Sequence, residues 1–414
     1  MERSGSSNGS RLAAAREGVR IAVVTPEYPP DHIGGGGIVS EALALEYAKT
    51  NEVRVFSAWD THRSWRGGRL ADLKDGVSVY RYPLVPLFRR QPHFRSVVPP
   101  NPAASFQLGQ DLKEWSPDVA HLHGYGYALV DLASAFLVRR KVPYIFTVHG
   151  LPQTPSRRRA PIRAAYAAYR RMGPVRTMAG ADAVTAISRA VAEALHSDRQ
   201  VTVVPNGITP LPGRDDRRAA RLSQRLGLEP GVPVIAAAGR LSRSKGFDVL
   251  LRALSDVGVP RLACVIAGAD GGELSTLRQI AALLPADIKV CFPGWLDREG
   301  LSDLFELAGV VAVPSRDEPF GLVALEAVGA TRRVVASRIG GLAEFLRPPV
   351  AELVELDDPK ELAGALHRAL SRGPLTGDEE RIADQVLIEH SWPSLSHEYE
   401  VLMMSSRLPA KAAR

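Results

Sequence analysis

Short runs of apolar, largely β-branched residues recur along the chain, separated by segments of helical periodicity. In the first half these runs are Val19–Thr25, Val53–Ser57, Val77–Tyr82, Asp118–His121, Tyr144–Val148, Ala183–Ile187 and Val201–Val204. Several of them are nearly continuous rather than alternating, which is typical of parallel strands covered on both faces. Their alternation with helical segments predicts βαβ units and an α/β fold.

A second series of apolar runs follows a break in this pattern. Residues 206–216 (NGITPLPGRDD) are rich in Gly, Pro and charge and indicate a linker. After it come the runs Val232–Ala238, Leu262–Ala267, Ile288–Phe292, Val310–Val313, Arg333–Ala336 and Ala351–Val354. The chain therefore holds two α/β units of similar size. A last helical pattern, Pro393–Met404, either caps the second unit or crosses back to the first, and the sequence alone leaves both open.

Length and composition narrow the class of protein. A chain of 414 residues with 45% hydrophobic and 23% charged residues is not disordered, and it suits two or three domains. No run approaches the roughly 18 apolar residues of a spanning helix, and residues 1–20 lack the apolar core of a secretion signal. Cys264 and Cys291 have no nearby His partners and fit two buried small side chains. We therefore expect a soluble, cytoplasmic, multidomain protein.

The positive charge is unevenly distributed. The net charge is +7, and no acidic residue occurs between Asp131 and Asp182. The cations of that stretch are Arg139, Arg140, Lys141, Arg157, Arg158, Arg159, Arg163, Arg170, Arg171 and Arg176. The resulting local field would attract an anionic substrate or a membrane surface. The segment 157–176 equally fits an ordinary amphipathic helix with its arginines outside. Aromatic residues make up 6% of the chain and do not interleave with the arginines, so we expect no nucleic-acid partner.

Two loops that follow buried strands carry the strongest candidate chemistry. In open α/β sheets, ligands bind beyond the carboxyl ends of the strands. The first loop, Gly239–Gly246, places Arg240 and Lys245 five residues apart, where they can converge on a diphosphate. The second loop, Pro314–Gly321, carries Glu318 and leads into a helix with Glu326. Carboxylates accept hydrogen bonds from vicinal hydroxyls, and the first turn of that helix offers free amides to an anion.

The first half of the chain supplies weaker candidates. Gly34–Gly37 follow the first strand after a Pro-rich segment and permit close approach of a ligand, although they match a dinucleotide fingerprint poorly. His149 ends one strand, and His121 and His123 end another. We favour a functional role for His149 and a structural role for the other two histidines. No His, Cys or Asp set has the spacing of metal ligands, so we expect neither metal nor cofactor.

Taken together, these motifs resemble the retaining nucleotide-sugar glycosyltransferases of family 4, which have the GT-B fold of two Rossmann-like domains. The resemblance covers nearly the whole chain, and its most specific part is the Glu-x7-Glu spacing of Glu318 and Glu326 combined with Arg240 and Lys245. The other matching segments are Pro26–Pro30 with the glycines, Thr147–Gly150, Ala181–Ser188, Pro205–Ile208 and Ser391-Trp392. One departure is Thr209, where family members often carry Asp, and the role of that Asp is not carried over.

The resemblance implies roles for individual residues. Arg240 and Lys245 would hold the donor diphosphate, Glu326 the ribose and Glu318 the donor sugar. The amides of Phe320, Gly321, Leu322 and Val323 would reach the sugar and phosphate, His149 would approach the sugar, and Gly36 and Gly37 would lie near the phosphates. The implied reaction moves a hexosyl group from a UDP- or GDP-linked sugar to a hydroxyl of a glycan, lipid or small molecule, with retention and without a metal. The catalytic set would be Glu318, His149, Arg240 and Lys245.

The resemblance also implies a division of the chain. Residues 1–18 form a tail, 19–205 an acceptor-binding domain, 206–216 a linker and 217–390 a donor-binding domain, and the final ranges are a closing helix at 391–405 and a tail at 406–414. Two other functions stay open at this point. One is a nucleotide-sugar epimerase or phosphorylase on the same fold, and the other is a non-catalytic basic binding protein. A peripheral contact of segment 157–176 with the inner face of the membrane is also left open.

Overall fold

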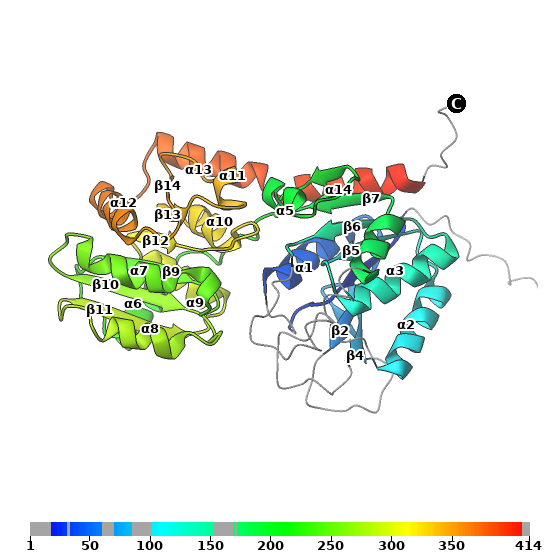
Figure 1. Cartoon of the computed structure of the whole chain (residues 1–414), viewed down its shortest axis with the longest axis horizontal. Helices are drawn as coiled ribbons and strands as arrows, with labels where there is room; N and C mark the ends of the chain where they lie inside the picture. The colour runs from blue at the N-terminus through cyan, green and yellow to red at the C-terminus, as the bar shows by residue number, and fades with distance from the viewer. Residues whose placement is uncertain are drawn as a thin grey trace, which may run out of the picture. The chain divides into compact units, whose positions relative to one another are not determined.

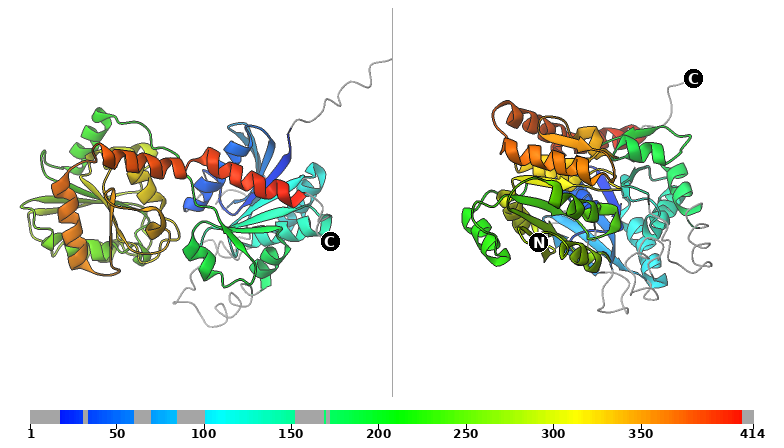
Figure 2. Two further views of the ribbon diagram at one scale, coloured as in Figure 1. Left: turned by 90° about the horizontal axis from the view of Figure 1, so that it is seen from above. Right: turned by 60° about the vertical axis from the view of Figure 1, so that its left-hand side comes forward.

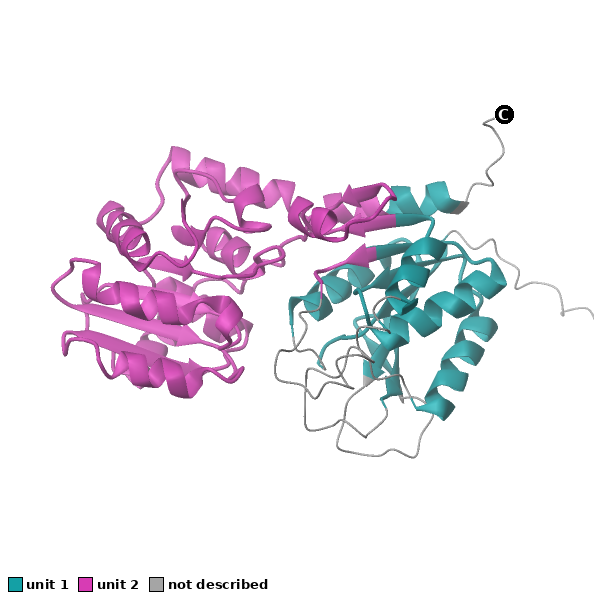
Figure 3. Ribbon diagram, in the orientation of Figure 1, with its two compact units in different colours: residues 1–146, 154–183, 400–414 teal, residues 147–153, 184–399 magenta. Residues whose placement is uncertain are grey.

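The computed structural model describes residues 18–30, 34–59, 70–84, 101–151, 169 and 172–407 (Figure 1). Contacts within the chain divide it into two compact units (Figure 3). The first comprises residues 1–146, 154–183 and 400–414, and the second comprises residues 147–153 and 184–399. The expected linker and the first strands after it, as well as the turn that carries His149, therefore belong to the second unit.

The first sheet has the strand order β3-β4-β2-β1-β5-β6-β7-β8. Its strands are β1 (Arg20–Thr25), β2 (Glu52–Trp59), β3 (Leu70–Lys74), β4 (Val77–Pro83), β5 (Val119–His123), β6 (Tyr144–Val148), β7 (Ala183–Ala186) and β8 (Val201–Val203). Strand β1 pairs in parallel with β2 and β5. The edge strand β3 pairs antiparallel with β4 and was not expected, because its sequence, LADLK, is too polar to stand out as a buried strand.

The second sheet has the order β11-β10-β9-β12-β13-β14, and all its strand pairs are parallel. Its strands are β9 (Val234–Ala238), β10 (Leu262–Ala267), β11 (Ile288–Gly294), β12 (Val310–Val313), β13 (Val334–Ser337) and β14 (Ala351–Val354). Strands β10 and β11 follow β9 toward one edge of the sheet. The chain then returns to place β12 on the other side of β9, and β13 and β14 continue toward the opposite edge. The loops that follow β9 and β12 therefore meet at the point where the strand order reverses, where ligands bind in sheets of this kind.

Helices cover both faces of each sheet (Figures 1 and 2). Those of the first unit are α1 (Gly35–Tyr47), α2 (Pro102–Trp115), α3 (Ala128–Arg140) and a segment at 172–180. Those that follow are α5 (Arg189–Ala194), α6 (Asp216–Leu226), α7 (Phe247–Ala253), α8 (Leu274–Ala281), α9 (Arg298–Leu307), α10 (Leu322–Gly329), α11 (Leu342–Phe345), α12 (Pro359–Arg372), α13 (Asp378–Glu389) and α14 (Trp392–Arg407). The two Rossmann-like α/β sheets confirm the expected fold class.

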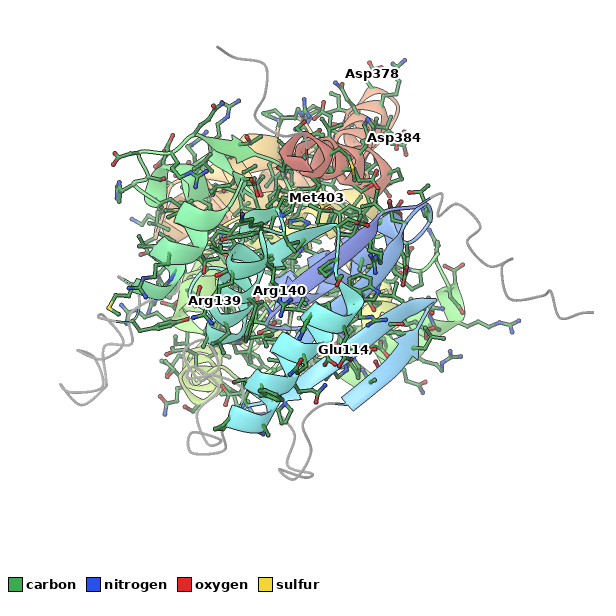
Figure 4. The ribbon with its side chains drawn as sticks, turned by 90° about the vertical axis from the view of Figure 1, so that its right-hand side faces the viewer. Glu114, Arg139, Arg140, Asp378, Asp384 and Met403 are labelled. Carbon is green, nitrogen blue, oxygen red and sulfur yellow. The ribbon has the colours of Figure 1, made fainter. Side chains whose placement is uncertain are left out.

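Apolar side chains of the second sheet and its helices form a continuous buried core. Fully buried members include Ile235, Leu250, Cys264, Val310 and Leu366. Cys264 fits the expectation of a buried small side chain, but Cys291 on the neighbouring edge strand is only half-buried. In the first unit, Met403 of α14 is fully buried, whereas Arg139 and Arg140 extend from the exposed last turn of α3 (Figure 4).

The start of the expected linker is a packed segment rather than a free connection. The Ile208 amide donates a hydrogen bond to the His390 carbonyl over 2.8 Å. Gly207 lies directly on the Trp392 indole, so that a side chain there would overlap the ring, and the Trp392 Nε1 donates to Thr209 Oγ1 over 3.0 Å. Residues 207–209 are thus held against the start of α14, within the second unit.

Candidate functional site

The loop after β9 and the loop after β12 lie in direct contact. Gly246 has a φ of +65°, and a Cβ at this position would overlap the Pro314 carbonyl oxygen. The Arg316 amide also donates to the Ser244 carbonyl over 2.7 Å. Glycine is therefore required at position 246, both for its backbone conformation and for the close approach. The contact brings Lys245 to the neighbouring loop.

Lys245 and Glu318 form an ion pair at this junction. The Lys245 Nζ lies 2.6 Å from the Glu318 Oε2, and Ser315 Oγ donates to the same oxygen over 3.2 Å. Two glycines support the loop from behind, since Gly340 packs on the Glu318 carbonyl and Gly341 on the Phe320 backbone. The structure thus brings together two of the predicted residues that stand 73 positions apart in the sequence.

Helix α10 begins immediately after this loop, at Leu322. Gly321 has a φ of +112° and no side chain caps the helix, while the first turn contains no acidic residue. The amides of the first turn therefore carry the positive end of the helix dipole without a capping side chain. The Phe320 side chain is buried, with its ring 5.1 Å from that of Phe345, so it anchors the loop. A ligand could meet this residue through its backbone amide.

Glu326 lies one turn further along α10 and is paired with an arginine that sequence reasoning did not identify. The Glu326 Oε1 lies 3.4 Å from Arg298 Nη1, and the Glu326 side chain is 14% exposed. Burial raises the pKa of the Glu326 carboxyl to about 7, against the opposing effect of the Arg298 charge. Near neutral pH this carboxyl therefore exists in both protonation states.

Arg240, by contrast, is exposed at the start of its loop. The aliphatic part of its side chain packs over Gly271 in the loop after β10, where a Cβ would lie 2.9 Å from Arg240 Cγ. The carboxyl ends of β9, β10 and β12 thus contribute to one edge of the sheet.

His149 lies in the second unit together with Glu318. A Cβ on Gly150, which has a φ of +140°, would lie 3.0 Å from Pro319 Cγ, and Ser188 Oγ donates to the Pro319 carbonyl over 2.7 Å. The turn that carries His149 therefore touches the loop of Glu318. Desolvation by the surrounding protein lowers the pKa of the His149 imidazole to about 4, so the ring is neutral at pH 7.

Gly36 and Gly37 occupy the first turn of α1 in the first unit, and Gly34 is its N-cap. This corrects the expectation of a glycine loop: the described part of it, Gly34–Gly37, opens a helix, and the Gly34 amide donates to Glu27 Oε2 over 3.1 Å. His121 and His123 are buried in the core of the same unit, where Tyr47 OH lies 3.0 Å from His121 Nδ1. This burial fits the structural role that we expect for both, which stays a prediction.

Arg316 is a further residue that sequence reasoning missed. Its guanidinium contacts both oxygens of Asp248 over 2.7 and 2.9 Å and Asp357 Oδ1 over 2.6 Å, and it donates to the Arg243 carbonyl over 3.0 Å. Since Arg316 belongs to the loop after β12 while Arg243 and Asp248 belong to the segment after β9, it joins the two loops. No local sequence signal marks this role, because the partners are 68 positions apart.

Trp295 was also missed, although it carries a recognisable signal. It directly follows β11, at the same sheet edge as Arg240, and its side chain is 65% exposed. A large aromatic ring at the carboxyl end of a strand offers a flat apolar face to a planar group. An aromatic residue in a Gly-bounded strand end is the signal that could have identified it.

Within the described ranges, no group of three or more His, Cys, Asp or Glu side chains is placed to hold a metal ion. No helix in the described part of the chain is long and apolar enough to cross a membrane. Of the basic segment 157–176, residues 157–168, 170 and 171 lie outside the described residues, and Arg176 is exposed.

Two family models match most of the chain between them. The model described as glycosyltransferase family 4 matches residues 33–210, and the model described as glycosyl transferases group 1 matches residues 219–384. An uncharacterized glycosyltransferase of Methanocaldococcus jannaschii is 27% identical over 92% of this chain and 96% of its own length. The D-inositol 3-phosphate glycosyltransferase of Xylanimonas cellulosilytica is 34% identical over 64% of this chain, and the match spans 65% of that enzyme.

Solved structures show the same architecture. Sucrose-phosphate synthase from Thermosynechococcus elongatus superimposes with a TM-score of 0.72 at 21% identity, over 94% of this chain and 98% of that one. Anabaena HepE, solved with UDP and glucose, has a TM-score of 0.69 at 18% identity, over 94% of this chain and 100% of that one. The fold is thus that of the GT-B glycosyltransferases. The chain belongs to the group 1 glycosyltransferases of family 4.

Proposed function

We propose that this glycosyltransferase moves a hexosyl group from a UDP- or GDP-linked sugar to an acceptor hydroxyl, with retention of configuration and without a metal ion. The observation that carries the proposal is the ion pair of Lys245 and Glu318 beside the uncapped start of α10, at the point where the strand order reverses. A cation, an anion-accepting helix start and a carboxylate for hydroxyls lie together where the loops after β9 and β12 touch.

The donor would occupy this edge of the second sheet. Lys245 and Arg240 would neutralise the diphosphate, and the amides from Phe320 to Val323 would add the helix N-terminus. Glu318 would accept hydrogen bonds from the sugar hydroxyls and Glu326 from the ribose hydroxyls. The exposed ring of Trp295 supports a stacking contact with the base.

The transfer step is a substitution at the anomeric carbon. The bond between that carbon and the departing phosphate oxygen breaks, and the acceptor oxygen bonds to the carbon on the same face. The acceptor proton passes to the departing phosphate oxygen. Negative charge grows on the phosphate as the bond breaks, and Lys245, Arg240 and the α10 amides would stabilise it. His149 is neutral at pH 7 and would contact the sugar by a hydrogen bond rather than by charge.

Nucleotide binding is the first test. At a nucleotide concentration of about 100 times Kd, UDP or GDP should stabilise the protein by about 2.7 kcal/mol, which a thermal-shift measurement detects readily. We expect one nucleotide to be preferred and EDTA to change nothing. If no nucleoside diphosphate stabilises the protein, the donor site is refuted and the alternative of a non-catalytic basic binding protein regains support.

The reaction is tested with the sugar conjugate of the preferred nucleotide. We expect product only when an acceptor is present, and NMR coupling of the anomeric proton should show the donor configuration. Conversion of the donor without an acceptor would instead indicate an epimerase. Because several relatives are named D-inositol 3-phosphate glycosyltransferases, a phosphorylated polyol belongs in the first acceptor panel beside glycans and lipids.

Glu318→Ala should lower the transfer rate by about 10²–10³-fold, the magnitude typical of removing one preorganised polar contact. Glu352→Ala is a matched control, since Glu352 pairs with Arg368 on the exposed face of α12. A Glu318→Ala enzyme that transfers at the rate of the control would remove Glu318 from the site.

We also propose that the basic segment 157–176, with the exposed Arg139 and Arg140, contacts anionic membrane surfaces. Sedimentation with vesicles that contain 30% phosphatidylserine, compared with neutral vesicles, tests this. Equal recovery with both vesicle types would refute the contact.

A further inference from the structure

Arg298 is the first residue of α9, at the same sheet edge as the candidate site. Asp297 caps this helix by accepting a hydrogen bond from the Gly300 amide over 2.8 Å. The Arg298 guanidinium makes three contacts. Nη2 donates to the carbonyls of Thr209 and Pro210 over 2.6 and 2.9 Å, while Nη1 lies 3.4 Å from Glu326 Oε1. One side chain therefore joins α10 to the segment that precedes α6.

The two carbonyl contacts determine the orientation of the guanidinium. A guanidinium is planar and rigid, so fixing one of its nitrogens fixes the direction of the others. The carbonyls belong to a segment that is itself held, because Thr209 Oγ1 accepts from Trp392 and Ile208 pairs with His390. The direction in which Nη1 points toward Glu326 is thus set by packed structure.

Glu326 depends on this contact because its carboxyl is largely removed from water. Its side chain is 14% exposed, and on the neighbouring turn Gly329 lies against the side chains of Ile208 and Leu387. Of the charged groups in the described structure, Arg298 is the one that acts on the Glu326 carboxyl. A carboxylate removed from water needs such a partner to keep its charge.

We propose that Arg298 is a positioning residue for donor recognition: it holds one oxygen of Glu326 so that the carboxylate presents the other to the ribose hydroxyls. The inference rests on the proposed function, which assigns Glu326 to the ribose. Arg298 acts through Glu326 and is not assigned a contact with the reacting atoms. It links the ribose-binding carboxylate to the segment 207–210, which is packed against the start of α14.

Arg298→Met, Arg298→Lys and the control Arg368→Met test this inference. Arg368 also pairs with a glutamate, its Nε lying 3.0 Å from Glu352 Oε1, but it is exposed on α12. Calorimetric titration with UDP, GDP and ADP across pH 6–9 gives the affinities. We expect Arg298→Met to weaken binding of the preferred nucleotide about tenfold at pH 7.5, in the range of a lost charge-assisted hydrogen bond. The Lys variant should recover only part of the affinity. It keeps the positive charge, but it lacks the planar guanidinium that contacts Glu326 and the two carbonyls at once.

A second readout does not depend on any nucleotide. Carbon-13 NMR of the glutamate carboxyls, with Glu326 assigned by the Glu326→Gln variant, follows the titration of Glu326 directly. We expect the midpoint to rise in Arg298→Met, to rise less in Arg298→Lys and to stay unchanged in Arg368→Met. Should Arg298→Met be too unstable to study, the Lys variant carries the same comparison.

The outcomes separate this inference from the proposed function. An unchanged Glu326 midpoint together with unchanged affinity in Arg298→Met would overturn the role of Arg298. Suppose that Arg298→Met shifts the Glu326 midpoint but the wild-type protein binds no nucleotide. This result would overturn the proposed function and the donor role, while the effect of Arg298 on Glu326 would be confirmed. Lower stability of the variant with neither readout changed would leave Arg298 a purely structural residue and would overturn the inference.

Discussion

At Gly246 a single backbone position determines whether two loops can meet. Its φ of +65° and its contact with the Pro314 carbonyl both exclude a side chain. The sequence motif predicted a glycine next to Lys245 as a boundary of the loop, but not this contact, because the partner lies far away in the chain. The absence of a side chain at Gly246 therefore allows the loops to approach and the Lys245–Glu318 ion pair to form.

Gly246→Ala should destabilise the protein and weaken nucleotide binding. The positive φ alone costs a non-glycine residue about 1–2 kcal/mol, and displacement of the Pro314 loop adds to that. Gly231→Ala is the control, because Gly231 has a φ of +78° with nothing within 4 Å of a Cβ. Urea unfolding and UDP titration of both variants provide the measurement. Equal losses in the two variants would contradict the importance of the loop contact.

Glu326 makes stability depend on pH in a predictable direction. Its pKa rises from an ordinary value of 4.5 to about 7 on folding, so the folded protein holds this proton more tightly than the unfolded chain. The stabilisation is complete below pH 4.5 and is lost as the pH rises through 7. We expect the difference in unfolding free energy between pH 5 and pH 8 to shrink by about 1–3 kcal/mol in Glu326→Gln. Urea unfolding at both pH values checks this, and an unchanged difference would contradict it.

At the scale of the elements, Arg316 joins the loop after β12 to the segment after β9 through its contacts with Arg243 and Asp248. This guanidinium and Asp248 are 19% and 18% exposed, and their bidentate contact is well sheltered from water. Sheltered, bidentate pairs resist screening and solvent competition far better than exposed ones. The geometry of Lys245 and Glu318 therefore depends on a residue that need not touch the ligand.

A double-mutant cycle of Arg316→Met and Asp248→Asn should give a coupling energy of about 1–3 kcal/mol in unfolding free energy. The control is the same cycle with Arg252→Met in place of Arg316→Met. Arg252 pairs with the same Asp248 over 3.0 Å but is 55% exposed, so we expect a coupling energy of less than about 0.5 kcal/mol. If the coupling energy of Arg316 with Asp248 is as small as that of Arg252 with Asp248, the two loops are held together by other contacts.

Sequence periodicity predicted these elements well and their side-chain networks poorly. The buried parallel strands were recognisable because burial on both faces leaves continuous apolar runs, whereas the polar edge strand β3 has no such pattern. Arg240, Lys245, Glu318 and Glu326 stood out because motif spacing is local. Arg298 and Arg316 did not, since an arginine reveals its partner only when the fold brings distant segments together. Gly34–Gly37 were expected as a loop, but glycine content does not prevent Gly35–Gly37 from forming the first turn of α1.

On the scale of the whole molecule, the candidate residues of the second unit come from separate stretches of chain. Residues 147–153 belong to this unit together with the second sheet, although residues 154–183, with the helical segment at 172–180, belong to the first unit. The turn that carries His149 thus reaches the Glu318 loop through tertiary contacts. Sequence order alone assigned this turn to the other domain.

Hydrogen exchange of the entire chain with and without the preferred nucleoside diphosphate should reveal where the ligand acts. We expect protection to concentrate in residues 239–246, 294–298 and 314–326, because ligand contacts slow the local opening of these loops. Helix α12, which carries none of the candidate residues, serves as an internal control and should not change. Protection confined to the first unit would contradict the proposed donor site.

The salt bridge between Lys245 and Glu318 also bears on selectivity. In the described structure Lys245 and Glu318 are partners, so a bare phosphate or pyrophosphate that drew the ammonium away would leave a sheltered carboxylate without its cation, with the hydrogen bond from Ser315 Oγ remaining. Under the proposed function a sugar diphosphate would avoid that loss, because its phosphate would bind the lysine while its sugar hydroxyls would bind the glutamate in the same event. The resting ion pair thus favours ligands that carry both functions in one molecule, and the abundant simple anions of a cell would be poor competitors for the site.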